Sequence, residues 1–110
     1  MLTYYDFLGE KHSLSAIVTQ YANNGNLAIQ LTEKEDGWEE PYAMLTVNLD
    51  EKLADGYAYV DTNNLPDAEG FILRNDLGVF TGRISHSGWC SYPLYQFDLA
   101  RLHEVEVKPT

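Results

Sequence analysis

The chain has 110 residues, 45% of them hydrophobic, which supports one packed core and is too short for two domains of ordinary size. Because 17 acidic residues outnumber 7 basic ones, the formal net charge is -10 at pH 7. This charge argues against direct binding to nucleic acid, whose phosphates attract lysine and arginine, and favours a basic partner. The sequence has no signal-peptide pattern and no apolar run near the roughly 20 residues of a membrane span, so it predicts one cytoplasmic domain over residues 1–110.

Alternation of apolar and polar residues predicts strands through the first half of the chain. The Asn-Gly pair in NNGN (23–26) and the Asp-Gly pair in EKEDGWEEP (33–41) indicate turns between them. The expected strands are TYYDFL (3–8), 14–21, 27–32, 42–49 and 57–60.

The segment NNLPDAEGFILRNDLG (63–78) is typical of one helix from about Leu65 to Asp76. Asn64 can cap this helix, Pro66 suits its first turn, and Gly78 is expected to stop it. A glycine- and serine-rich loop should follow, and then one or two closing strands in YPLYQFDLARLHEVEV (92–107). The fold prediction is an α+β domain with a mainly antiparallel sheet of about five to seven strands and one helix packed on it.

The stretch GRISHSGWCSYPLYQFD (82–98) contains the residue types of nucleophilic catalysis. Cys90 or Ser87 could act as nucleophile with His86 as base. Such a pair must approach within about 3 Å and usually needs an orienting carboxylate, which adjacent positions of an extended segment do not supply. A shaped loop that enters a strand explains the glycines, serines and aromatic residues more simply. We therefore expect no enzyme, and keep Arg83 and His86 as secondary contact residues.

The sequence offers little for metal or cofactor binding. Its single cysteine, Cys90, excludes an internal disulfide and a cysteine-based zinc cluster, and His12, His86 and His103 lie far apart without a paired spacing. No Walker or dinucleotide-binding glycine motif occurs. We predict no metal site and no cofactor.

Acidic residues concentrate between positions 33 and 51. Two interpretations stay open: a solvated face that keeps the protein in solution, or a recognition surface that docks on an arginine- and lysine-rich groove through an aromatic anchor. The predicted partner-binding residues are Glu33, Glu35, Asp36, Trp38, Glu39 and Glu40, with Asp50 and Glu51 beside them.

The motifs VDTNNLPDAEGFI, GVFTGR and SGWCSYPLYQFD follow one another, and ANNGNLAIQL and AMLTVNL precede them. On these motifs, residues 14–98 resemble a bacterial family of small proteins known only as a domain of unknown function. The resemblance implies carriage on plasmids, conjugative elements or phages, and no assigned catalytic residues. It further implies a likeness to anti-restriction or anti-CRISPR proteins, which block a host nuclease.

The leading hypothesis is a non-enzymatic accessory protein of a mobile element that binds and inhibits a basic host-defence protein. A CRISPR nuclease or its guide complex is the expected partner, without direct binding to nucleic acid or membrane. Two alternatives remain: a small enzyme that uses the 82–91 loop, and a structural module whose tyrosine-rich faces form a homo-oligomer.

Overall fold

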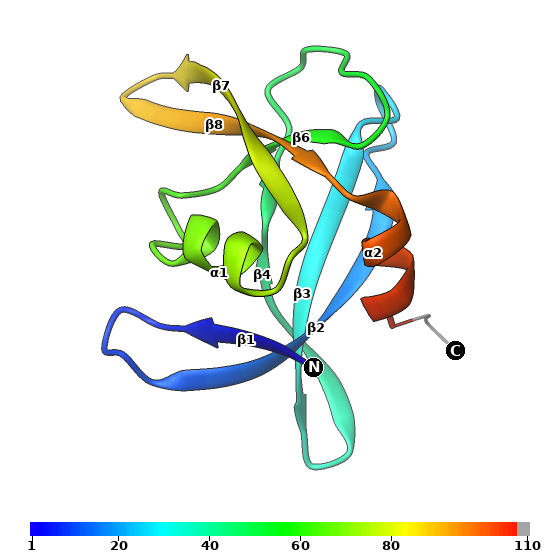
Figure 1. Cartoon of the computed structure of the whole chain (residues 1–110), viewed down its shortest axis with the longest axis vertical. Helices are drawn as coiled ribbons and strands as arrows, with labels where there is room; N and C mark the ends of the chain where they lie inside the picture. The colour runs from blue at the N-terminus through cyan, green and yellow to red at the C-terminus, as the bar shows by residue number, and fades with distance from the viewer. Residues whose placement is uncertain (108–110) are drawn as a thin grey trace.

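The first half of the chain forms an antiparallel sheet whose strands follow their order in the sequence. In the computed structural model, which describes residues 1–107, this sheet contains β1 (Leu2–Tyr5), β2 (Lys11–Gln20), β3 (Leu27–Glu35) and β4 (Trp38–Met44). The turns predicted at NNGN and at Asp36-Gly37 are confirmed, because they separate β2 from β3 and β3 from β4 (Figure 1).

A second antiparallel sheet contains β5 (Thr46–Val47), β6 (Tyr57–Val60), β7 (Gly78–Ser87) and β8 (Cys90–Phe97), in the order β5-β6-β8-β7. The prediction of a loop over 82–91 is wrong, because β7 and β8 form a long hairpin (Figure 1). Its turn is at Gly88 and Trp89. Most of β7 is exposed, so its sequence lacks the alternation that marks a half-buried strand. The mainly antiparallel α+β class is confirmed, but the described residues form 8 strands in two sheets, where a single sheet of five to seven strands is predicted.

The two sheets meet where the chain passes from β4 to β5. Leu45 is fully buried at this point; its N–H donates to the Ile29 carbonyl at 2.9 Å, and its own carbonyl accepts from the Asp61 N–H at 2.9 Å. Next to it, the Ile29 N–H donates to Oγ1 of Thr46 at 3.1 Å. The single strand predicted over 42–49 is therefore divided at Leu45, because its two halves pair with different neighbours.

The predicted helix is confirmed in a shorter form as α1 (Ala68–Arg74). Asn64 does not cap it, because Asp67 occupies the N-cap position. At the other end Asp76 has a φ of 57°, and the Leu77 and Asp76 N–H groups donate to the Ile72 and Leu73 carbonyls at 2.9 and 3.2 Å, which satisfies two of the last carbonyls of the helix. The helix therefore ends before the predicted stop at Gly78, which instead begins β7.

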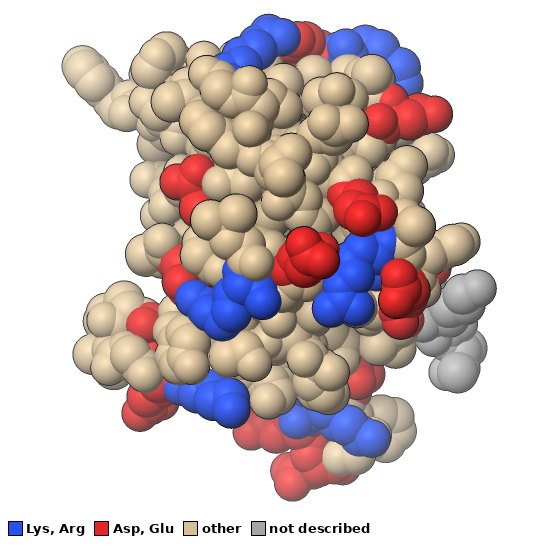
Figure 2. Space-filling model, in the orientation of Figure 1, with Lys and Arg blue, Asp and Glu red and all other residues tan. Residues whose placement is uncertain are grey.

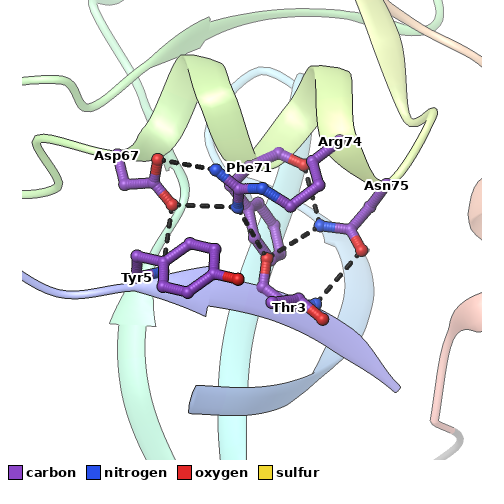
Figure 3. Close-up of polar contacts among 6 residues, drawn as sticks. All are labelled: Thr3, Tyr5, Asp67, Phe71, Arg74 and Asn75. Carbon is purple, nitrogen blue, oxygen red and sulfur yellow. Dashed lines mark hydrogen bonds and ion pairs between the residues drawn. The ribbon is translucent and has the colours of Figure 1, made fainter. Parts of the chain in front are cut away.

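Side chains of α1 and of the residues that flank it, Asp67 and Asn75, cover the outer edge of β1 (Figure 3). Asn75 accepts a hydrogen bond from the Thr3 N–H at 3.1 Å and donates to the Thr3 carbonyl at 3.0 Å. Arg74 also donates to the Thr3 carbonyl and forms an ion pair with Asp67, whose carboxylate accepts from the Tyr5 N–H at 3.0 Å. The backbone of an edge strand, which would otherwise be open to another chain, is thus bonded within the molecule.

A second helix, α2 (Leu99–Val105), follows β8 in the segment where closing strands are predicted to extend to 107. That extension is wrong, and so is the count of one helix. The Asp98 side chain accepts from the Arg101 N–H at 3.1 Å and caps the helix, while Leu102 is buried against the core. The sequence HEVEV (103–107) alternates as a strand would. The cap and the burial of Leu102 nevertheless favour a helix through Val105.

One cluster of buried apolar side chains joins both sheets and both helices. Its members include Tyr4 of β1, Val60 of β6, Phe71 of α1 and Leu102 of α2. The rings of Tyr4 and Phe71 pack edge to face with centroids 5.7 Å apart, so α1 is fixed to the first sheet by apolar as well as polar contacts. Neither helix in residues 1–107 has the length and apolar character needed to cross a membrane.

The Asp67–Arg74 ion pair makes stability depend on pH. Burial raises the pKa of the Asp67 carboxyl, but the hydrogen bonds from Arg74 and the Tyr5 backbone outweigh it and leave the pKa below 3.8. A depressed carboxyl pKa stabilises the folded state above the unfolded value and loses that contribution as the pH falls through the folded value. Asp67→Asn should therefore cost about 1 kcal/mol at pH 7 and progressively less below pH 4.

Urea unfolding of both proteins between pH 2.5 and pH 7 measures this difference. Asp55→Asn, at an exposed position, is the matched control and should show little pH-dependent change. A stability difference for Asp67→Asn that stays constant across the range would contradict the assigned role of the carboxylate.

Candidate functional site

The hairpin formed by β3 and β4 carries most of the predicted binding residues. We call residues 33–40 the acidic hairpin. It projects at the lower end of the molecule in Figure 1, and Figure 2 shows acidic side chains gathered at that end with basic side chains beside them. The turn residues Asp36 and Gly37 have φ values of 51° and 85°, as in the tight turns that match the twist of paired strands. The local sequence thus builds a projecting hairpin.

Strand register sets which side chains share a face of the acidic hairpin. Glu33 lies opposite Glu40, and Glu35 lies opposite Trp38, so three carboxylates and the indole share one face. Trp38 is 73% exposed. Directly opposed glutamates repel each other, which means that this charge pattern does not serve the stability of the hairpin.

Two of the acidic side chains are engaged within the molecule. Glu39 accepts a hydrogen bond from the Thr32 hydroxyl at 2.7 Å, and Glu33 contacts Nδ1 of His12 at 2.8 Å. For Glu35, Asp36 and Glu40 the structure gives no side-chain hydrogen bond or ion pair within residues 1–107. These three carboxylates are available to a partner.

Asp50 and Glu51 do not lie beside the acidic hairpin, so their predicted position is wrong. Asp50 contacts Asn23, and the Glu51 carbonyl accepts from the Asn26 amide at 2.6 Å, so both residues lie by the turn between β2 and β3, at the opposite end of β3. The physical reason is the direction of the chain. From the tip of the hairpin β4 runs back along β3, and the passage at Leu45 carries the chain on into the second sheet.

Glu51 is part of a polar network with the secondary candidate Arg83. Nη2 of Arg83 lies 2.8 Å from Oε2 of Glu51, and the hydroxyl of the buried Tyr59 donates to Oε1 of Glu51 at 2.8 Å. Tyr59 also shares a hydrogen bond with the Ser85 hydroxyl of β7. Glu51 and Arg83 thus have an internal structural role.

The other secondary candidate, His86, pairs across the β7–β8 hairpin with Ser91, and their side chains lie 2.9 Å apart. Ser91 is not one of the nucleophiles that the sequence suggests, which are Ser87 and Cys90. Both residues of the pair are exposed, and within residues 1–107 no carboxylate is bonded to the His86 ring. The orienting group of a Ser-His-carboxylate arrangement is therefore missing from the described contacts of this ring.

A charged cluster beside the acidic hairpin is not foreseen from the sequence. His12 of β2 contacts Asp6 through Nε2 at 2.9 Å and Glu33 through Nδ1 at 2.8 Å. The hydrogen bond that the His12 ring donates to Asp6, and after it the one donated to Glu33, raises the pKa of His12 above 6.5, and the bond to Asp6 also lowers the pKa of Asp6. The available sequence signal is the short turn between Asp6 and His12, which returns the second residue to the first.

The family described as a domain of unknown function (DUF4313) matches residues 16–108 of the chain. Comparisons with curated proteins and with solved structures give no match. The match covers the acidic hairpin and the β7–β8 hairpin, while Asp6 and His12 precede it.

The engaged and free acidic residues should differ in their effect on stability. Glu51→Ala removes acceptors from Tyr59 and Arg83 and should cost about 1 kcal/mol in the free energy of unfolding. Glu35→Ala should change it by less than about 0.5 kcal/mol, because surface substitutions away from such contacts have small effects. Urea unfolding of the two variants compares them directly, and equal losses would show that Glu35 has a structural contact as well.

Proposed function

The chain belongs to the DUF4313 family of domains of unknown function, and we propose that it acts by binding a basic partner protein through the acidic hairpin. The observation that carries this proposal is the exposed indole of Trp38 on a projecting hairpin whose carboxylates Glu35, Asp36 and Glu40 have no described internal partner. Exposed aromatic side chains are frequent anchors of protein interfaces.

Charge defines the class of partner. The chain has a net charge of -10, and its acidic hairpin includes only one basic residue, Lys34. Complementary charge speeds association with a lysine- and arginine-rich surface and selects against acidic partners. Glu33 and Glu40 lie opposite each other, and like charges in this position destabilise the hairpin. This pair therefore favours partner binding, and not stability, as the reason for the acidic residues.

Two double variants with the same change in net charge distinguish binding through the acidic hairpin from a general effect of charge. The double variant Glu35→Lys, Glu40→Lys should weaken binding at least about tenfold, as should Trp38→Ala, since loss of an interface tryptophan often costs about 2 kcal/mol or more. The matched control Asp55→Lys, Glu104→Lys changes the net charge by the same amount at exposed positions outside the hairpin. It should retain near-normal affinity.

The experiment is quantitative affinity purification from a bacterial lysate with the parent chain and the three variants, followed by calorimetry with the purified captured protein. Capture that depends on Trp38, Glu35 and Glu40 but not on Asp55 and Glu104 supports the proposal. An equal loss of affinity in the control double variant would show that only net charge matters. Full binding by Trp38→Ala would contradict the role of Trp38 as an interface anchor.

The narrower hypothesis drawn from the sequence names a CRISPR nuclease complex as the basic partner. It predicts that the chain slows target-DNA cleavage by a purified, guide-loaded nuclease and that Glu35→Lys, Glu40→Lys relieves this inhibition. If the chain does not slow cleavage by a tested nuclease, that nuclease is excluded as the partner. The affinity purification described above then tests binding to other basic proteins.

A further inference from the structure

The turn between β1 and β2 brings the side chains of Asp6, Glu10 and His12 together, with one ligand atom of each lying within 4.8 Å of the others. Within residues 1–107 it is the one group in which three side chains of metal-ligating type converge in this way. We propose that these residues bind a divalent transition-metal ion, for which zinc is the reference. This inference does not depend on the proposed function of the acidic hairpin.

The backbone of the turn orients the Asp6 carboxylate. Oδ1 accepts hydrogen bonds from the N–H groups of Leu8 and Glu10, each at 2.9 Å, while Gly9 turns the chain with a φ of 82°. Because Oδ1 is held in this way, Oδ2 faces Nε2 of His12 at 2.9 Å. Asp6 therefore presents one oxygen toward the imidazole before any ion arrives.

Glu33 holds the opposite side of the His12 ring. Its carboxylate lies 2.8 Å from Nδ1, and the Tyr42 ring packs against the imidazole with centroids 5.1 Å apart. Histidine ligands of metal ions commonly donate their second ring N–H to a carboxylate, which fixes the tautomer and leaves the other nitrogen to the metal. Glu33 fits this role, and Nε2 is then the ligand atom.

The donor set determines the class of ion. One imidazole nitrogen and two carboxylate oxygens suit zinc and related transition ions, whereas calcium and magnesium prefer oxygen ligands throughout. The Asp6 and His12 side chains are each 19% exposed and Glu10 is exposed, so an ion can enter from solvent. Binding would replace a proton on Nε2, which leaves to solvent, and water would complete the coordination.

Calorimetric titration of the chelator-treated full chain with zinc chloride tests the site. His12→Asn and Glu10→Gln should each weaken zinc binding at least about tenfold, and Glu33→Gln by about 10–100-fold through loss of the orienting carboxylate. His103→Asn is the matched control, because His103 also contacts a carboxylate, Glu106, at 2.7 Å but lies on α2. The control should bind zinc as the parent chain does.

Glu10→Gln keeps the test decisive if His12→Asn fails to fold, because the exposed Glu10 side chain has no described hydrogen bond. Amide resonances of residues 6–12 should broaden first when cobalt replaces zinc. No zinc binding by the parent chain, equal weakening in His103→Asn, or equally tight binding of calcium would each overturn the proposal.

Discussion

The passage of the chain through Leu45 is the constraint on which the arrangement of this protein depends. A buried backbone group must be hydrogen-bonded, and here the amide of Leu45 is satisfied by β3 while its carbonyl is satisfied by the segment after β6. One residue therefore joins two sheets, and the apolar faces of both sheets share one core. The element order of Figure 1 follows, with the tip of the β3–β4 hairpin at one end of β3 and the loop after β5 at the other.

This geometry separates acidic residues that are neighbours in the sequence. Glu35, Asp36 and Glu40 lie on a hairpin outside the core, where their charges face solvent. Glu51, at the opposite end, balances Arg83 and accepts from the buried Tyr59. Acidic residues that are close in the sequence thus have two physical roles. Glu51 accepts hydrogen bonds within the molecule, whereas Glu35, Asp36 and Glu40 face solvent.

The edge of the first sheet shows how the fold limits unwanted pairing and leaves other groups available. Asp67, Arg74 and Asn75 of the α1 region bond the outer backbone of β1, which closes that edge to another strand. Immediately beyond it, the turn to β2 leads Asp6 back to His12, and β3 contributes Glu33 to the same cluster. The acidic hairpin and this cluster therefore share Glu33.

The sequence by itself determined the α+β class, the strands at 14–21, 27–32 and 57–60, their turns, and the existence of α1, because alternation and Asn-Gly or Asp-Gly pairs are local signals. It also identified Trp38 and its acidic neighbours as one exposed segment. Only the tertiary structure decided the break at Leu45, the helical form of 99–105 and the separation of Glu51 from Glu40, since each depends on a partner distant in the chain. The same holds for His12: its contact with Asp6 arises from the turn between β1 and β2, and its contact with Glu33 requires the pairing of β2 with β3, which no spacing of histidines along the sequence could reveal.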